Sequence, residues 1–519
     1  MEYIAFEKKV RIVFVFQVAS FWTSWEKLYQ SCLEDERFEV KLMWIDDISG
    51  DVAQMASGEE FLIKRNIEYD VFDYEKIMRF QPHYMVYQTP YDKGHRPIST
   101  WSSRFRRSGI RIIYIPYGIE ISDTRESRYK HFALPVVINA FRIYVISQEM
   151  KKEYEKYCIN SKAVLDMGLP RFDVLKDKEK FALSETLINR INNRKVILWK
   201  THFPKIFIEN EIKKQATPKL EEYIKFVDFI RETPDLFFIF MPHPKFVDET
   251  IDESLRMLAK TLIEKLEKLE NVYIDTKDDY RYSLMNSDAI IVDRSAVMVE
   301  AGAVGVPVLY MYNSDYSEPM TPPIQKLLDS YYQGETAEEM KKFCIACLSD
   351  LDERKEEREK VFAECVPYFD GKCAQRIKEE LLEEVQKEHK NEIVERFTEN
   401  AEIFMFGTGG ISRYCMDIYY ETKEKSNLNV HVKGFIDNDK KKQKEYRYGK
   451  PIIAPDEINQ KQFDYIVIGS NEYVTEIYTQ LTKDLGVPKE KILSFDQFLT
   501  LTAFPEHLRN KYQYKEIRS

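Results

Sequence analysis

The stretch "AIIVDRSAVMVEAGAVGVPVLYM" (residues 289–311) contains two short apolar runs separated by a polar turn and a helical segment. The runs Ala289–Val292 and Val308–Met311 are typical of strands that are buried on both faces of a sheet. The segment between them is rich in small residues, which let a helix pack closely on the sheet. An order of strand, helix and strand indicates a parallel sheet covered by helices. This stretch therefore predicts the α/β class.

The same alternation extends through most of the chain and forms two blocks. We expect two Rossmann-like lobes with a central cleft, residues 1–188 and residues 189–385, the second with closing helices. These closing helices carry many glutamates and lysines, and we expect them to face solvent. The other predicted strands are Arg11–Phe16, Glu39–Ile45, Tyr84–Tyr87, Arg111–Ile115 and Arg142–Ile146 in the first block, and Lys195–Trp199, Leu236–Met241 and Val272–Ile274 in the second.

A third block begins at "FMFGTGGISRY" (404–414), after a predicted helical linker at 386–400. A strand followed by Gly407, Gly409 and Gly410 resembles a dinucleotide-binding turn, and "VKGFIDND" (432–439) ends a second strand at Asp437, where a ribose-binding acid would sit. We therefore expect a small Rossmann-like accessory domain over 401–519. Its glycine-rich turn favours a nucleotide or nucleotide sugar as ligand, and NAD chemistry or a purely structural role are the alternatives.

Composition excludes several classes of protein. The net charge of −10 argues against general nucleic-acid binding, and seven scattered cysteines favour buried thiols in a reducing cytosol. No run approaches ~18 apolar residues, so we expect no membrane span, and the first residues do not form a signal peptide. The arginine-rich stretch "WSSRFRRSGIR" (101–111) is either a solvated helix face or a contact for an anionic acceptor or lipid head groups. We expect a cytoplasmic protein, with attachment to the inner face of the membrane as an open alternative.

Polar residues follow several strands of the second block. In "FIFMPHPKF" (238–246), two prolines end a strand and hold the histidine between them just past its carboxyl end. Ligands of open α/β sheets bind at this edge, and the free N–H groups of a helix start there favour anions. Ser295 is placed either to cap the following helix or to bind a phosphate. The candidate residues at this edge are Lys200, His202, His243, Asp293, Arg294, Ser295 and Glu300.

An ordered set of motifs makes a resemblance visible. "MGLPRFDVL" (167–175), the Pro-His-Pro sequence, the Asp-x-Ser helix start and "FDGKCAQRI" (369–377) together resemble the CDP-glycerol glycerophosphotransferase family, which has the two-lobed glycosyltransferase type B (GT-B) architecture. The resemblance implies a transferase of teichoic acid, capsule or lipopolysaccharide synthesis. Such an enzyme moves a polyol phosphate or a sugar from a CDP- or other NDP-linked donor to a glycan or lipid-linked acceptor, with the acceptor on the first lobe and the donor nucleotide on the second.

The resemblance also implies roles for individual residues. His243 and the turn Asp293–Ser295 would hold the diphosphate with Lys200, His202 and Arg294 as cationic partners, and Glu300 would bind the ribose. Family members use a first-lobe His-Gly as the base, but "YIPYGIEISDT" (114–124) has Tyr117 there, and tyrosine is a poor base at neutral pH. We therefore expect Asp92 first and His95 second as the base, with Tyr117 lining the acceptor pocket. No acidic cluster demands a metal, and we expect that neither a metal nor a cofactor is required.

Two other functions stay open at this point. The stretch at 293–309 also resembles UDP-N-acetylglucosamine 2-epimerases, although Ala296 and Val297 replace that family's Gly-Gly. The altered position 117 would also suit a non-catalytic scaffold of capsule assembly that senses a nucleotide sugar. The sequence leaves open the donor base, the transferred group, the acceptor and the oligomeric state.

Overall fold

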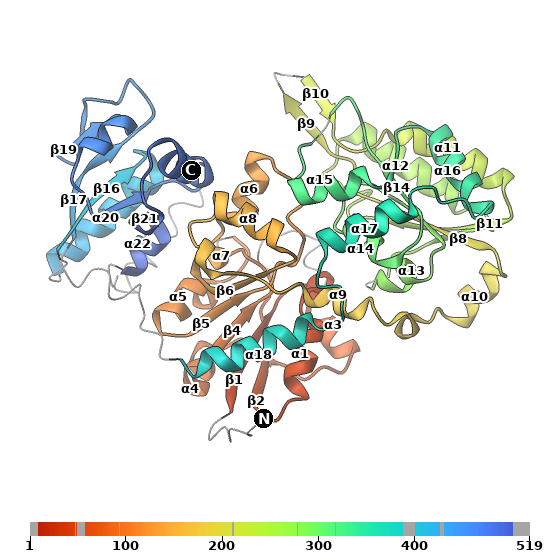
Figure 1. Ribbon diagram of the computed structural model, residues 1–519, viewed down its shortest axis with the longest axis horizontal. Coiled ribbons are helices and arrows are strands. Elements are labelled where there is room, and N and C mark those ends of the chain that lie inside the picture. The colour runs from red at the N-terminus through yellow and green to blue at the C-terminus, as the bar shows by residue number, and fades with distance from the viewer. Residues whose placement is uncertain are drawn as a thin grey trace.

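The computed structural model describes residues 9–501, apart from residues 47, 49–57, 93, 210–211, 278, 317, 388–399 and 426–429. Three sheets, each with its own helices, follow one another along the chain (Figure 1). The predicted α/β class, with two Rossmann-like lobes and a third small α/β domain, is confirmed. Most of the predicted linker at 386–400 lies outside the described residues. None of the helices in the described part of the chain has the length and apolar composition needed to cross a bilayer.

The first lobe is built on a seven-stranded parallel sheet. Its central strands are apolar on both faces because helices cover both sides. Its helices are α1 (Glu26–Leu33), α3 (Gly58–Lys64), α4 (Tyr74–Phe80), α5 (Ser102–Arg107), α6 (Arg125–Phe132), α7 (Pro135–Asn139), α8 (Gln148–Tyr157) and α9 (Pro170–Val174). In sheet order the strands are β3 (Asp70–Val71), β2 (Phe38–Trp44), β1 (Val10–Phe16), β4 (Tyr84–Tyr87), β5 (Arg111–Tyr114), β6 (Ala140–Val145) and β7 (Val164–Asp166).

The second lobe has a six-stranded parallel sheet and a short antiparallel hairpin of β9 (Ile206–Glu209) and β10 (Ile212–Gln215). Its helices are α10 (Glu185–Ile191), α11 (Leu220–Glu232), α12 (Glu253–Leu266), α13 (Arg281–Met285), α14 (Val297–Val304), α15 (Pro322–Asp329), α16 (Ala337–Leu348), α17 (Lys355–Cys365) and α18 (Cys373–Val385). In sheet order the strands are β12 (Val272–Ile274), β11 (Leu236–Pro242), β8 (Lys195–Thr201), β13 (Ala289–Val292), β14 (Val308–Met311) and β15 (Tyr332–Gly334).

The two lobes are joined along a clasp between two loops. Two backbone hydrogen bonds of 2.8 Å connect Asp123 to Pro319 and Thr321 to Ile121. They form a short antiparallel bridge between the loop after β5 and the loop before α15. One hydrophobic cluster also continues from the first sheet to one face of the second. The lobes therefore share packing as well as a cleft.

Helix α18 corrects the expectation that the closing helices face solvent. It leaves the second lobe and packs against α1 of the first (Figure 1). Ile377 and Leu381 are fully buried in that contact. The carboxylate of Asp173, in the "MGLPRFDVL" motif, accepts the backbone N–H groups of Cys373 (2.9 Å) and Ala374 (2.7 Å) at the start of α18. The two motifs therefore meet at one junction, and the charged sequence of the helix concealed its apolar side.

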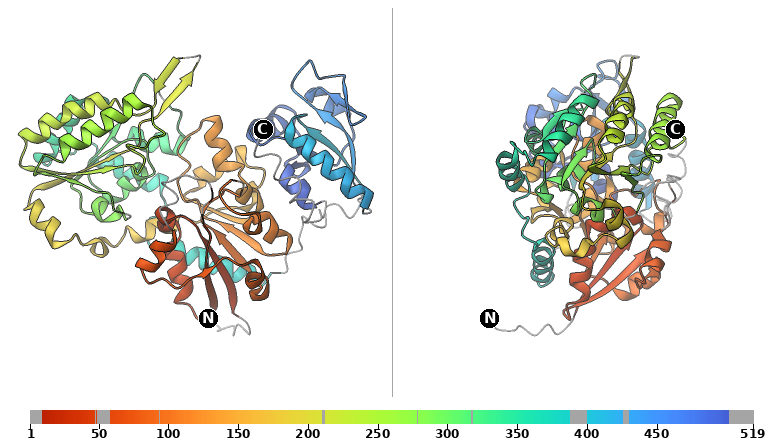
Figure 2. Two further views of the ribbon diagram at one scale, coloured as in Figure 1. Left: turned by 180° about the vertical axis from the view of Figure 1, so that it is seen from behind. Right: turned by 90° about the vertical axis from the view of Figure 1, so that its right-hand side faces the viewer.

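The third sheet has the order β18 (Tyr446–Arg447), β19 (Lys450–Ile453), β17 (Val430–Ile436), β16 (Ala401–Phe406), β20 (Tyr465–Ile468) and β21 (Ile492–Ser494), with helices α20 (Gly410–Lys425), α21 (Val474–Thr479) and α22 (Phe495–Leu501). This domain lies on the side of the first lobe opposite the second lobe (Figure 2). Helix α21 packs on α6 and α8, and Tyr129 and Ala133 contact the domain's apolar core. Arg125 of α6 stacks over the ring of Tyr473 at 4.2 Å.

The contact of α18 with the first lobe yields a prediction. Glu380 accepts from the Arg142 guanidinium (2.7 Å) and from the Tyr144 hydroxyl (2.5 Å), and it is almost buried. We expect Glu380→Gln to lower the free energy of unfolding by about 1.5–3 kcal/mol, because a charge-assisted bond becomes a neutral one. Chemical denaturation measures it. The matched control is Glu383→Gln on the exposed side of the same helix, which should change stability by less than about 0.5 kcal/mol. Equal effects would show that the buried ion pair does not hold α18.

Candidate active site between the two lobes

A cavity of about 850 Å³ lies between the lobes at the carboxyl ends of β8, β11 and β13. Both lobes contribute to its walls, which is the location that the sequence predicted for a ligand. Six of the predicted site residues line it: Tyr117, Lys200, His202, His243, Arg294 and Ser295. Asp92, His95, Asp293 and Glu300 are not among its lining residues.

His243 follows the last residue of β11 and is oriented by its own loop. The backbone N–H of Lys245 donates to its Nδ1 (3.0 Å). Because this nitrogen accepts, the neutral ring carries its proton on Nε2, and that N–H is a donor. The two flanking prolines thus hold a ring whose remaining nitrogen suits an anionic oxygen.

His202 lies beside His243, with 5.1 Å between ring centroids, and has the opposite tautomer. Its Nδ1 is 2.9 Å from the carbonyl oxygen of Phe203, which can only accept, so Nδ1 carries the proton. Burial lowers the pKa of His202 well below its usual value, and nearby positive charge adds to the effect. The pair therefore offers one N–H donor and one unprotonated ring nitrogen.

Asp293 supports the site from behind. Its carboxylate is 1% exposed and accepts from the backbone N–H of His202 (2.6 Å) and from the hydroxyl of Tyr223 (3.3 Å). It therefore ties the loop after β8 to the end of β13. Burial raises the pKa of Asp293 and lowers that of Lys200, whose ammonium group donates to the carbonyl oxygen of Thr201 (3.0 Å).

Ser295 and Arg294 differ in their contacts with other side chains. The N-cap of α14 is Ala296, and no side chain caps this helix. The Oγ of Ser295 is buried, and no described residue forms a hydrogen bond with it. Such an atom is uncommon in a folded protein and indicates a partner from a ligand. Arg294, by contrast, is ion-paired with Glu318.

Glu300, the expected ribose contact, lies in a buried polar cluster. It is 1% exposed, accepts from the hydroxyl of Tyr280 (2.7 Å), and lies 3.2 Å from Nε of Arg171. Arg171 belongs to α9 of the first lobe, so this is an ion pair between lobes. The motif "MGLPRFDVL" thus supplies a buried cation that the carboxylate neutralises, and the ribose contact stays a prediction.

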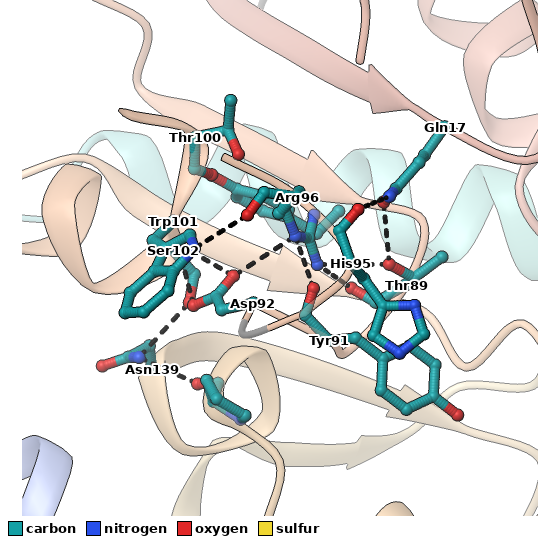
Figure 3. A network of polar contacts seen from close by, with 12 residues as sticks. Gln17, Thr89, Tyr91, Asp92, His95, Arg96, Thr100, Trp101, Ser102 and Asn139 are labelled. Atoms are coloured by element: carbon teal, nitrogen blue, oxygen red, sulfur yellow. Dashed lines mark hydrogen bonds and ion pairs between the residues drawn. The ribbon is translucent and has the colours of Figure 1, made fainter. Parts of the chain in front are cut away.

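Asp92 and His95, the residues predicted as the base, lie away from the cavity. The carboxylate of Asp92 is 1% exposed and accepts from the N–H and the Oγ of Ser102, the latter at 2.6 Å (Figure 3). It also lies 3.4 Å from Nε of the buried Arg96. The ring of His95 stacks on Tyr91 with centroids 4.4 Å apart. Asp92 therefore holds the first turn of α5 and the loop after β4.

Tyr117 lines the cavity, as predicted. Its hydroxyl is 2.8 Å from that of Tyr91, and its ring stacks on Phe21 with centroids 4.0 Å apart. Burial raises the pKa of Tyr117 well above its usual value, so the phenol stays protonated at neutral pH. These three rings form an aromatic wall on the first-lobe side.

Several titratable residues of the cavity wall were missed from the sequence, among them Glu120, three positions after Tyr117, and His131 of α6. Each of these two has a buried polar atom that no side chain or backbone group in the described ranges hydrogen-bonds. The only signal for Glu120 was a charge between two isoleucines, which occurs on many surface strands. His131 lies in a helix that the sequence did not predict.

The glycine-rich turn of the third domain has the expected form. Gly407 follows β16 with φ of +98°, and α20 begins at Gly410. The hydroxyl of Thr408 donates to Asp437 at the end of β17, and Lys442 lies 3.4 Å from the same carboxylate. Gly409 has open space around it. The predicted residues Gly407, Gly409, Gly410 and Asp437 therefore meet at one edge of this sheet.

Solved structures with a similar fold include several two-lobed proteins. A UDP-N-acetylglucosamine 2-epimerase has 16% identity and a TM-score of 0.50, over 73% of this chain and 97% of that chain. MnaA of S. aureus, in a structure with UDP, has 16% identity and a TM-score of 0.50, over 72% and 97%. The wall teichoic acid polymerase TagF has 13% identity and a TM-score of 0.48, over 73% and 89%. At these identities the epimerases show the fold alone.

The family comparisons are more specific. No curated protein sequence matches the chain significantly. Residues 399–493, in the third domain, match the model of the C2185-like N-terminal region. Residues 124–383, just over half of the chain, match the model described as CDP-Glycerol:Poly(glycerophosphate) glycerophosphotransferase. This match runs from α6 to α18 and includes both motifs of the inter-lobe junction and the second-lobe wall of the cavity. The chain therefore belongs to the CDP-glycerol:poly(glycerophosphate) glycerophosphotransferase family.

Proposed function

We propose that this chain transfers a polyol phosphate from a CDP-linked or related nucleotide donor to a hydroxyl group of a surface-glycan acceptor, as in teichoic acid or capsule synthesis. One observation carries the proposal: in a chain of this family, His243, Lys200 and Ser295 converge on one cavity between the lobes. Neither the acceptor nor contact with a membrane follows from the family alone, and both belong to the proposal.

The second-lobe wall suits a diphosphate. The Nε2–H of His243, the ammonium group of Lys200 and the hydroxyl of Ser295 are three donors of different strength on one wall. Hydrogen bonds between such donors and an anion are roughly twice as strong as neutral ones. Donors aimed at the bridging and leaving oxygens stabilise the charge that grows as the nucleotide departs. Phosphoryl transfer depends mainly on this positioning and charge neutralisation, and no metal is part of the proposal.

The first-lobe wall suits the acceptor. Phe21, Tyr91 and Tyr117 present stacked rings and two hydroxyl groups to the cavity. A polyol or sugar offers both apolar faces and hydroxyl groups to such a wall. A lipid contact through residues 101–111 has less support, because Arg104 stacks on Tyr74 at 3.7 Å and Arg106 donates to the carbonyl oxygen of Ile138.

The proposal includes a nucleotide or nucleotide sugar at the turn Gly407–Gly410 of the third domain. The open backbone at Gly409 supports it. Asp437 would exchange Lys442 for the ribose hydroxyl groups, since the lysine is half exposed. This accessory site is independent of the transfer reaction.

Nucleotide release tests the proposed function. CDP-, UDP-, GDP- and CMP-linked compounds are incubated with the protein, with and without a glycan or lipid-linked acceptor. A transferase releases nucleotide chiefly when the acceptor is present. An epimerase converts a UDP-sugar without acceptor, and a scaffold does neither, so either result would overturn the proposal.

We expect Ser295→Ala to weaken donor binding about tenfold or more, because a hydrogen bond to a charged group contributes about 1.5–3 kcal/mol. His243→Ala should lower turnover at least tenfold, a loss of more than ~1.4 kcal/mol of transition-state stabilisation. Isothermal titration with donor and the rate of nucleotide release measure the two effects. Controls are Ser349→Ala, directly after α16, and His431→Ala on β17, both on the exposed surface. Unchanged affinity and rate in the two site variants would remove the diphosphate from this wall.

For Asp92 we expect a loss of stability and little change in rate, because its carboxylate contacts Arg96 and Ser102 and does not line the cavity. Asp92→Asn should lower the free energy of unfolding by about 3 kcal/mol, because the buried Arg96 loses its counter-charge. At temperatures where the variant is folded, the acceptor-dependent rate should change by only a few fold. Asp73→Asn, at an N-cap where asparagine serves equally well, is the control. A stable Asp92→Asn protein with a rate reduced by ~10²-fold would instead restore Asp92 as the base.

A further inference from the structure

We propose that Glu120 is the catalytic residue that accepts the proton of the attacking acceptor hydroxyl. This inference rests on the proposed function and assigns the group that the family's first-lobe histidine supplies elsewhere. Glu120 lies three residues after Tyr117, in the same loop after β5.

The clasp places Glu120 next to the phosphate side of the cavity. The hydroxyl of Thr321 donates to the backbone carbonyl of Glu120 (2.6 Å). Two residues further on, Ser122 donates to Glu318 (2.5 Å), which also accepts from Arg294 (2.8 Å). The carboxylate of Glu318 therefore connects the loop that carries Glu120 to the turn Asp293–Ser295. A hydroxyl group bound against this loop would be close to a phosphate held by the turn.

The carboxylate of Glu120 has one satisfied and one unsatisfied oxygen. It belongs to a residue that is 2% exposed and lines the cavity. Its Oε1 accepts from the hydroxyl of Tyr154 (2.6 Å), whereas Oε2 is buried and has no hydrogen-bond partner among residues 9–501 that the structure describes. Buried carboxylate oxygens rarely lack a donor because the desolvation cost is high. A hydroxyl of the acceptor would supply the missing donor.

The surroundings give this carboxylate the basicity that proton transfer needs. Burial raises the pKa of Glu120 to about 7, while the hydrogen bond from Tyr154 and the charge of Arg171 act in the other direction. The titratable and charged groups that face it are Tyr154 on α8, Arg171 on α9 and Tyr114 on β5. A base is most effective when its pKa lies near the working pH.

The other groups of the first-lobe wall are less suitable. Burial, together with the positive charges of Lys130 and Arg294, lowers the pKa of His131 to about 4, so its imidazole binds protons weakly. Tyr117 stays protonated because burial raises its pKa. Glu126 is paired with Lys130 at 2.6 Å, and Asp123, which does not line the cavity, is paired with Arg128 at 2.7 Å.

In the proposed step one bond forms, one bond breaks and one proton is transferred. The acceptor oxygen forms a bond to the phosphorus of the transferred polyol phosphate, and the bond from that phosphorus to the bridging oxygen breaks. The nucleoside monophosphate leaves with the electron pair of that bond. The hydroxyl proton passes to Oε2 of Glu120 and is later released to solvent.

Glu120→Gln is the first test, because glutamine keeps the shape and the bond from Tyr154 but cannot take a proton. We expect acceptor-dependent nucleotide release to fall by ~10²-fold or more, with donor affinity unchanged. Glu153→Gln is the matched control: Glu153 is a buried glutamate one residue from Tyr154, also has an unpaired oxygen, and is not part of the cavity wall. It should keep the wild-type rate.

Tyr154→Phe is the second test and acts through Glu120 as a positioning change. Loss of the phenol removes a bond that lowers the pKa of Glu120, so the pKa rises. Since the base must be unprotonated, the rate of the wild type should rise with pH through about 7, and in Tyr154→Phe this rise should move to higher pH. A purely structural role would lower the rate at all pH values without moving the profile.

Several outcomes would overturn the inference. A Glu120→Gln protein that binds donor and keeps more than about a tenth of the rate would exclude Glu120 as the base. The same holds if His131→Asn abolishes turnover while Glu120→Gln does not. If Glu120→Gln does not fold, an unmoved pH profile in Tyr154→Phe would overturn it alone. Failure of the proposed function is distinguishable, because the wild type would then release no nucleotide with any acceptor.

Discussion

The buried ion pair between Arg171 and Glu300 is the interaction on which the geometry of the cavity depends. Both side chains are almost inaccessible, and they come from different lobes. Two charges removed from water stabilise a structure only when they stay together, and loss of one partner typically costs about 3–5 kcal/mol. Glu300 lies in the first turns of α14, the helix that begins directly after Ser295. The pair thus connects helix α14, which follows the turn Asp293–Ser295, to helix α9 of the first lobe.

The ability of the cavity to bind an anion depends on which of its cations are already paired with a carboxylate. Arg294 is paired with Glu318, and Asp293 is fully occupied by backbone and tyrosine donors. Besides Lys200 and the His243–His202 pair, the lining residues Lys205, Lys245 and Lys277 add positive charge to the second-lobe wall. The two rings have opposite tautomers. His243 can therefore donate a hydrogen bond to an anionic oxygen while His202 accepts one from a donor. A single imidazole whose Nδ1 is already bonded to the backbone could offer only one of the two.

The fold was largely predictable because strands and their ends have local signals. The strands Tyr84–Tyr87, Val272–Ile274, Ala289–Val292 and Val308–Met311 have the predicted bounds, since apolar runs end at prolines, glycines or polar turns. The second-lobe wall was predictable for the same reason, as carboxyl ends of parallel strands share one edge. The hairpin β9–β10 and helix α6 had no comparable signal, because their apolar residues lack a clear period.

The first-lobe side of the site could not be predicted, because its assignments depend on contacts between residues far apart in sequence. Asp92 follows a strand as a ligand-binding residue would, but the path of its loop directs it to Arg96 and Ser102. The environment of Glu120 is made by Tyr154, thirty-four positions away, and by the second lobe. The position of Glu300 in the first turn of α14 suited a ligand contact. Its ion pair with Arg171 of α9 is seen only in the structure.

Helix α6 is shared between two neighbours, and this has a consequence for how the chain can be divided. Ser127, Lys130 and His131 line the cavity, while Tyr129 packs against the third domain and the half-exposed Arg125 stacks over its Tyr473. A protein truncated before β16 would expose to water the apolar residues of α6 that pack on the third domain. The helix would then lose the packing partner on the side that faces away from the cavity. The third domain therefore supports the first lobe from outside, with helix α6 packed between it and the cavity.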